Sequence, residues 1–331
     1  MSAPSTPTGA GTPTGAGMPG GPGSVAVAGG AVAPAHPPTD WAAISFEGLG
    51  RPIKGPSALG SDPGRLWHLT WALAKTEFKL AFFGSALGYL WQLMRPLLLF
   101  GVIYLVISHS KLAAGSHQPH FGAALLLGIV LFNFFSESTG GGLSSLVNRE
   151  NLVRKIEFPR LAVPLSIVVT ALLNLSLNLV PVVLFLVLDG GSPMWSWLEL
   201  PLLVAILALL AAGLGMILSV SYVRYRDVRP IWEVVLQMTF YASGIFIAIL
   251  TLAPVKVFGL SVSIAHVLMA NPFAALLEQA RHVFISSSYP SAASAIGGVG
   301  LLMIPVAIAL VALVGGFLLF DHEAPRVAEQ L

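Results

Sequence analysis

A short charged segment, residues 150–160, lies between two long apolar stretches of the sequence. Its charged side chains have both signs: Glu150, Arg154, Lys155, Glu157 and Arg160. Because charges in this number are too costly to place in lipid, the segment must lie in water. Interleaved positive and negative charges suit docking on a complementary surface better than simple retention of a loop on one side of a membrane. The charged segment therefore predicts a binding site for a partner protein.

A carboxylate also occurs inside the apolar stretch that precedes this segment. Glu137 would cost several kcal/mol if it faced lipid, so we expect it to point into a helix bundle, a cavity or a partner chain. In the next apolar stretch, Asn174 and Asn178 are four residues apart and share one helix face. Such polar side chains either bond neighbouring helices or line a translocation path, and bonding between helices is the more frequent explanation.

The motifs of nucleotide-binding and catalytic proteins are absent from the sequence. No Gly-x-x-x-x-Gly-Lys-Ser/Thr segment is found, and the triple glycine at 140–142 is followed by leucine and serines, so the chain cannot bind ATP in the P-loop manner. The closest histidines, His117 and His120, are three residues apart in a predicted loop, where solvation is more usual than metal binding. We therefore expect no catalytic residues, no metal site and no cofactor in this chain.

The composition is that of a polytopic membrane protein. Apolar residues make up 55% and charged residues 10% of the chain, and the mean hydropathy is +0.82, whereas about 25% of residues are charged in soluble domains. The net charge of +2 is too small to imply binding to nucleic acid. Cysteine is absent, which excludes disulfides and thiolate metal sites.

The sequence predicts an all-α protein with three parts: a disordered Gly/Pro/Ala-rich tail over residues 1–60, an amphipathic helix over 61–83, and a membrane domain over 84–331. Each helical crossing needs roughly 20 mostly apolar residues. Six apolar segments meet this requirement: Leu87 to Ile107, Phe121 to Leu146, Leu161 to Leu188, Leu198 to Tyr222, Ile231 to Leu250, and Ala295 to Phe320.

The amphipathic helix is expected to begin at Asp62-Pro63 and to lie along the membrane surface. Basic side chains recur on one face at steps of three and four, and Trp67 and Trp71 lie among the apolar residues. A basic helix with tryptophans suits the boundary between water and anionic lipid. An ordinary surface helix is the alternative.

The distribution of basic residues selects an orientation in which the N-terminus is cytoplasmic. With six crossings, the cytoplasmic side carries Arg149, Arg154, Lys155, Arg160, Arg224, Arg226, Arg229 and Arg326, and the outer side carries Lys111, Lys256 and Arg281. The second cytoplasmic loop contains Arg224, Arg226, Asp227 and Arg229, and for its three arginines retention by positive charge is a sufficient explanation.

The apolar run Phe273 to Phe284 is too short to cross the membrane and too apolar for a solvated loop. We expect it to enter the membrane from the outer side and return, next to the exit of a pathway, since such backbone must be buried by protein or border a water-filled cavity.

The sequence resembles the transmembrane subunit of ABC-2 type exporters, particularly those that move polysaccharides, including O-antigen, and teichoic acids. The motifs that carry the resemblance occur in order from about Arg65 onward: Gly84-Ser85-Ala86-Leu87-Gly88-Tyr89-Leu90-Trp91 with Pro96, Phe134-Phe135-Ser136-Glu137, residues 151–160 with Pro164, Arg226-Asp227-Val228, and Asn271-Pro272 with Arg281. The sequence departs from the family late in the fifth apolar segment, where Ser243-Gly244-Ile245-Phe246 replaces a Ser-Pro-Ile-like break. Glycine there imposes no proline kink.

The resemblance implies a homodimeric permease in the plasma (inner) membrane, with both termini cytoplasmic, in which each copy docks on a separate ATP-binding subunit. That subunit would bind ATP and Mg²⁺. The ATPase-coupling residues would be Glu150, Asn151, Arg154, Lys155, Glu157, Phe158, Pro159 and Arg160. The gate helix at the lipid surface would use Trp67, Trp71, Lys75, Phe78 and Lys79. The aromatic channel candidates are Trp91, Phe132, Phe135, Phe240 and Tyr241, because aromatic faces can stack on sugar rings, although aromatic residues in a bundle are more often core. Glu137 is a further channel candidate, as a carboxylate within the membrane.

The expected function is ATP-driven export of a lipid-linked cell-surface polysaccharide or teichoic-acid-like polymer. The alternative within the family is efflux of a drug or lipid. A secondary transporter would instead carry several acids inside the membrane and inverted repeats, and a membrane scaffold would not need a docking segment. Copurification of a nucleotide-binding protein distinguishes these classes.

Overall fold

The computed structural model describes residues 63–82, 88–109, 119–150, 159–192, 194–246, 255–257, 260–262 and 264–330. All of them lie in the unit Lys54–Leu331. The predicted disordered tail and residues 151–158 of the charged segment lie outside the described residues.

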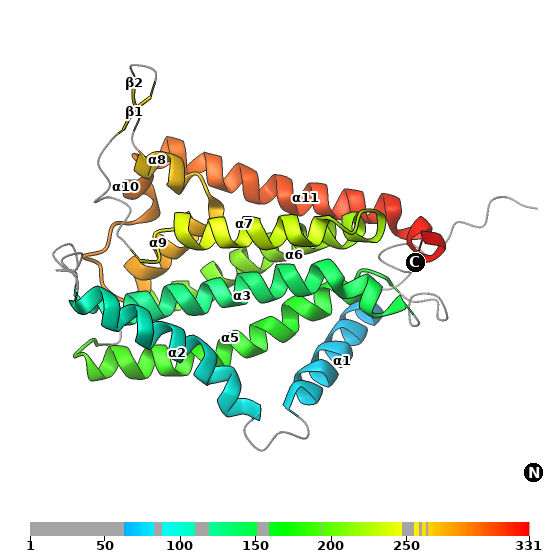
Figure 1. The fold of residues 1–331 in the computed structure, drawn as a ribbon, viewed down its shortest axis with the longest axis horizontal. Coiled ribbons are helices and arrows are strands. Elements are labelled where there is room, and N and C mark those ends of the chain that lie inside the picture. The colour runs from blue at the N-terminus through cyan, green and yellow to red at the C-terminus, as the bar shows by residue number, and fades with distance from the viewer. Residues whose placement is uncertain are drawn as a thin grey trace, which may run out of the picture. The chain divides into compact units, whose positions relative to one another are not determined.

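The described part of the chain is helical except for one short hairpin (Figure 1). The long elements are α1 (Pro63–Phe82), α2 (Gly88–His109), α3 (Phe121–Asn148), α5 (Ala162–Leu188), α6 (Leu200–Arg224), α7 (Val228–Ala242), α9 (Pro272–Phe284) and α11 (Val299–Gln330). The short ones are the 3₁₀ helix η3 (Trp195–Glu199), α8 (Ile264–Met269) and α10 (Ala292–Ile296). Strands β1 (Val255–Val257) and β2 (Leu260–Val262) pair antiparallel, with Lys256 opposite Ser261.

Five of the described helical segments are long and apolar enough to cross a membrane. They are Leu90–His109, Phe121–Asn148, Ala162–Leu188, Trp195–Arg224 and Val299–Ala324. The chain therefore has the architecture of a multi-pass α-helical membrane protein, as predicted.

The predicted crossing at residues 231–250 is not a single long helix within the described residues. Helix α7 has 15 residues and is about 22 Å long at the usual rise per residue, which is less than the hydrocarbon thickness of about 30 Å. A turn at residues 243–246 follows it, and residues 247–250 lie outside the described part. The described residues thus contain helices long and apolar enough for five of the six predicted crossings.

The last long helix begins later than predicted. Residues Ala292–Ile296 form the separate helix α10, because Gly297 (φ 96°) and Gly298 (φ 133°) take backbone conformations that L-residues avoid and so interrupt the helical path. Helix α11 then starts at Val299 and continues past the predicted end at Phe320 to Gln330.

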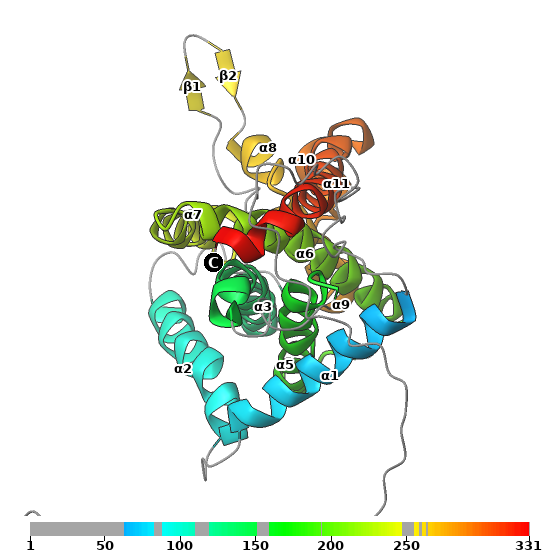
Figure 2. The same ribbon diagram turned by 90° about the vertical axis from the view of Figure 1, so that its right-hand side faces the viewer.

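Helix α3 is the centre of the bundle. It contacts α2, α5, α6, α7 and α9, and Figure 2 shows it between α2, α5, α6 and α7. Its contact with α6 depends on small residues, since a Cβ at Gly142 would lie 3.0 Å from Cα of Gly215. Close approach of backbones through glycine is the usual means of helix packing in membranes, where lipid removes the hydrophobic drive for association.

The apolar run at residues 273–284 forms the helix α9. Asn271 caps it, because its Oδ1 accepts a hydrogen bond from the N–H of Phe273 at 3.0 Å, and Pro272 occupies the first helical position. Helix α9 is buried over most of its surface, by contacts with α3, α6 and η3 and with α8, α10 and α11. That it enters the membrane from outside remains a prediction.

Candidate functional site

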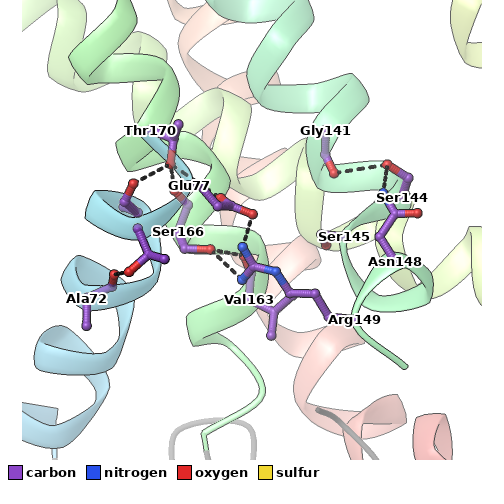
Figure 3. Close-up of polar contacts among 12 residues, drawn as sticks. Ala72, Glu77, Gly141, Ser144, Ser145, Asn148, Arg149, Val163, Ser166 and Thr170 are labelled. Carbon is purple, nitrogen blue, oxygen red and sulfur yellow. Dashed lines mark hydrogen bonds and ion pairs between the residues drawn. The ribbon is translucent and has the colours of Figure 1, made fainter. Parts of the chain in front are cut away.

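The end of α3 determines where the charged segment starts. Helix α3 ends at Asn148, after a stretch in which serine side chains bond back to the helix. Ser145 Oγ donates to Gly142 O at 2.6 Å, and Ser144 Oγ donates to Gly141 O at 3.4 Å (Figure 3). Asn148 Nδ2 in turn donates to Ser144 Oγ at 3.2 Å. Such bonds compete with regular helix geometry. Arg149 follows directly and is the last residue before the charged segment.

Arg149 joins three helices at what we call the polar junction, which consists of Glu77, Arg149, Ser166 and Thr170. Its guanidinium forms an ion pair with Glu77 of α1 and donates from Nη1 to Ser166 Oγ of α5 at 3.0 Å. Thr170 Oγ1 lies 2.9 Å from Ser166 O and 3.4 Å from Glu77 Oε2. Figure 3 shows Glu77 and Ser166 meeting the Arg149 guanidinium, with Thr170 bonded to Glu77 and Ser166 on the far side. The polar junction thus ties the start of the charged segment to α1 and α5.

The ion pair of the polar junction is partly shielded from solvent. The side chains of Arg149 and Glu77 are 15% and 31% exposed. The contribution of this ion pair to stability should therefore be intermediate. An exposed pair contributes little, whereas disruption of a buried pair leaves an uncompensated charge. Loss of the Arg149–Glu77 pair should therefore affect both stability and the position of α1.

The other end of the charged segment is anchored by burial. Pro159, Arg160 and Leu161 are buried directly before α5, and the N–H groups of Ala162 and Val163 donate to the carbonyls of Pro159 and Arg160. Burial lowers the pKa of the Arg160 guanidinium. Within the described residues, Arg160 Nη1 has no hydrogen-bond partner. Both ends of the charged segment are therefore fixed to the bundle, while its middle lies outside the described part of the chain.

Helix α1 presents a mixed aromatic and basic face to the exterior. Trp67 and Trp71 are 59% and 44% exposed and stack with their ring centroids 6.5 Å apart. Lys75 and Lys79 are exposed and Phe78 is half-buried. Thr70 and Ala74 are buried, and α1 contacts α5. The predicted gate residues therefore occupy largely outward-facing positions, and their function at the lipid surface remains a prediction.

The predicted channel residues lie in two different environments. Phe132 and Phe135 are buried and contact Phe273 at centroid distances of 5.7 and 5.2 Å, and Phe132 also contacts the half-buried Phe240 at 4.7 Å. Trp91 and Tyr241 are exposed within the single chain. The structure thus does not bring all of these aromatics together.

Glu137 points into the bundle, which was one of its three expected environments. Asn174 of α5 donates from Nδ2 to Glu137 Oε1, and Asn178 donates to Asn174 O at 2.9 Å. Two residues after Glu137 on α3, Thr139 Oγ1 accepts a hydrogen bond from Nε1 of Trp232 of α7 at 3.2 Å. These bonds link α3 to α5 and α7, as expected for polar residues that bond neighbouring helices.

The second basic loop lies at the same end of the bundle as the charged segment. Leu146 of α3, Leu161, and Val220 and Val223 of α6 belong to one buried cluster. The turn that follows α6 carries the exposed residues Arg224, Arg226 and Asp227. The Arg226 guanidinium lies 5.2 Å from the ring centroid of Tyr222.

Sequence reasoning missed Glu77, Ser166 and Thr170. A usable signal existed for Glu77, which is the single acidic residue of the otherwise basic α1. A lone carboxylate among cations indicates a specific partner. No comparable signal marks Ser166 or Thr170, whose bonds follow from the crossing of α1 and α5.

Long apolar helices around a central α3 define a polytopic membrane protein, and both ends of its charged segment are anchored to the bundle. Residues 68–285, more than half of the chain, match the family described as ABC-2 type transporter. The chain therefore belongs to the ABC-2 type transporter family, whose members are transport permeases and not enzymes, as the sequence motifs predicted.

Curated relatives of this chain carry the name O-antigen export system permease protein RfbA. The protein from Myxococcus xanthus is 27% identical over 264 residues, which cover 78% of this chain and 94% of the relative. A protein of the same name from Klebsiella pneumoniae is 26% identical over 226 residues, covering 68% of this chain and 83% of the relative.

Proposed function

We propose that the chain is the permease subunit of an ATP-driven exporter that moves a lipid-linked cell-surface polysaccharide across the plasma (inner) membrane. The observation that carries the substrate class is the match, over most of both chains, to permeases named for O-antigen export. Efflux of a drug or lipid and export of a teichoic-acid-like polymer are the alternative outcomes of the test below.

The geometry supports coupling to a separate ATP-binding subunit through residues 150–160. This segment is tethered to the bundle at Arg149 and at Arg160, so a force applied between these points acts on the ends of α3 and α5. The Arg149–Glu77 ion pair passes the same displacement to α1. A rigid connection at both ends is what a lever requires.

A second copy of the chain would complete the pathway. Helices α2 and α7 expose large apolar side chains, including Trp91, Val102, Ile231 and Tyr241. Lipid or another protomer must cover these faces. The positive-inside rule supports a cytoplasmic location for the Arg149 end of the bundle and for both termini, on the side where ATP is available.

The test is deletion of the gene in its native host, followed by separate measurement of polymer on the surface and of lipid-linked polymer inside the cell. We expect surface polymer to be lost and lipid-linked polymer to accumulate. Wild-type chain should restore export, whereas Arg154→Ala combined with Phe158→Ala should insert normally and fail to restore it. Unchanged surface polymer with altered drug susceptibility would favour efflux instead.

The ATPase partnership is tested by copurification. The tagged chain, solubilised in detergent, should retain a nucleotide-binding protein and another copy of itself. Arg154→Ala should reduce the amount of nucleotide-binding protein recovered. Recovery of the chain with no nucleotide-binding protein would contradict the proposal.

A further inference from the structure

Helix α7 stops inside the bundle and not at its surface. The N–H of Ser243 closes the last turn on Thr239 O at 3.0 Å, and Gly244 then takes a left-handed conformation (φ 74°). Ser243, Gly244 and Ile245 are all buried. Backbone carbonyls in such a break lose their helical partners, and a buried carbonyl without a partner is unfavourable.

The carbonyls of this break are bound by a side chain from α9. Arg281 donates from Nη1 to Gly244 O and from Nη2 to Ile245 O, both at 2.9 Å. A planar guanidinium fork can hold two neighbouring acceptors in this way, whereas a lysine ammonium is a single point charge. Arg281 therefore replaces two hydrogen bonds that a continuing helix would have made.

The charge of Arg281 is balanced within the same helix. Glu278 Oε2 accepts from Arg281 Nη1 at 3.1 Å, and the two residues are only 2% and 4% exposed. A buried ion pair is often less stabilising than apolar residues of the same volume. The Glu278–Arg281 pair is explained if it holds the backbone of Gly244 and Ile245, which Arg281 binds, in a single conformation.

The break is also seated against the central helix. A Cβ placed on Gly128 of α3 would lie 3.3 Å from Cγ2 of Ile245 and 3.5 Å from Nη2 of Arg281. Beyond the break, the ring of Phe246 packs on Phe240 at a centroid distance of 4.9 Å. The turn after α7 is thus enclosed by α3 and α9.

We propose that Arg281 is a positioning residue that fixes the turn at residues 243–246 and so sets where α7 ends and which face α7 exposes. That face carries Ile231, Val234, Met238 and Tyr241. The inference concerns the conformation of α7 and does not depend on the identity of the exported molecule. Only its consequence for transport rests on the proposed function.

The test uses the natural absence of cysteine, which makes any introduced thiol unique. In the full chain in detergent, we would measure the rate at which N-ethylmaleimide labels Ser243→Cys, a nearly isosteric change at a buried site. Adding Arg281→Gln should speed labelling about tenfold, because both carbonyl contacts are lost and the turn opens more often. The matched control, Arg229→Gln, removes an exposed arginine of α7 and should leave the rate unchanged.

A second measurement keeps the inference testable if Arg281→Gln fails to fold. The pair Gly128→Cys and Ile245→Cys should form a disulfide readily, because the two positions are in contact and removal of the isoleucine branches makes room. Arg281→Lys keeps the charge and loses the fork, and should slow this disulfide about fivefold. Equal labelling rates with Arg281→Gln, or an unchanged disulfide rate with Arg281→Lys, would overturn the proposal.

Discussion

Arg149 and Glu77, which are 72 positions apart in the sequence, form an ion pair that joins the end of α3 to α1. Because Nη1 of Arg149 also donates to Ser166 on α5, a single guanidinium holds three helices together. Arg149 directly precedes the charged segment. Any displacement of that segment is therefore shared with α1 and α5.

Removing one partner of this pair should weaken both the fold and the coupling. We expect Glu77→Gln to lower the free energy of unfolding by about 1–2 kcal/mol, between the values for exposed and buried pairs, and to reduce polymer export by more than the loss of folded protein explains. The exchange of charges, Glu77→Arg with Arg149→Glu, should restore part of the export. Glu233→Gln, which removes an exposed pair on α7, is the control and should have little effect in the same thermal-unfolding and export assays.

The approach of α6 to α11 should be intolerant of any side chain at Gly316. A Cβ there would overlap the backbone of Gly213, and a Cβ at Gly213 would lie 2.6 Å from Ala312 O. Gly316→Ala should therefore separate the two helices and lower the unfolding midpoint in detergent, with less folded protein on size-exclusion chromatography. The neighbouring Gly315, where no atom lies within 4 Å of an added Cβ, is the matched control. Gly315→Ala should leave the midpoint unchanged or raise it slightly, since alanine favours helix by about 0.5–1 kcal/mol.

The Glu137–Asn174 hydrogen bond should depend on the acceptor and not on its charge. Glu137→Gln keeps an oxygen that can accept from Asn174 Nδ2, whereas Asn174→Ala leaves the carboxylate without that donor. Asn174→Ala should thus destabilise the protein by about 1 kcal/mol more than Glu137→Gln, a size typical of polar contacts between membrane helices. Guanidinium or SDS titration of the purified variants measures this difference. If Glu137→Gln proved the more damaging, the carboxylate would have a function beyond packing.

Alkaline pH should destabilise the loop that contains Tyr289. Burial raises the pKa of Tyr289 to about 12 from its usual value of 10.0, and the phenol donates to Pro119 O at 3.2 Å. Above pH 10 the phenol of Tyr289 loses its proton in the unfolded chain but keeps it in the folded chain. The free energy of unfolding therefore falls as the pH rises from about 10 to about 12. The stabilisation that the protonated Tyr289 provides is fully present only below about pH 10. Between about pH 9 and about pH 12 the loss should reach about 2 kcal/mol.

Tyr289→Phe isolates that contribution. The variant should show a smaller fall in unfolding midpoint over the same alkaline range than the parent chain, because it has no phenol to ionise. Tyr225→Phe, at an exposed position, should follow the parent. Identical alkaline slopes for the parent chain and Tyr289→Phe would contradict this assignment.

Hydropathy and length were enough to predict the five long helices, because each needs a continuous apolar run and little else. The predicted limits of α3 and α5 lie within two residues of those observed. The end of α7 could not be predicted in this way. Its position depends on Arg281, 37 residues further along the chain, and no local pattern reports a contact of that range.

The polar junction was only partly visible in the sequence for the same reason. The charges of residues 150–160 indicated a docking segment, but the attachment of Arg149 to Glu77 requires α1 to cross α5 at Thr170. The sequence also did not show which of the predicted channel aromatics are buried in the core and which are exposed. Phe132 and Phe135 are buried core residues within the chain, whereas Trp91 and Tyr241 are exposed, and composition alone does not distinguish the two cases.

The unequal burial of the spanning helices has a consequence for how the protein senses its lipid surroundings. Within the chain, 78% of the most apolar window of α3 is buried, against 11% for α2 and 17% for α11. A thicker or thinner bilayer acts on helices that touch acyl chains, which tilt to match it. Hydrophobic mismatch should thus act first on α2 and α11 and reach α3 only through neighbouring helices, leaving the central helix a comparatively fixed axis about which the outer ones tilt.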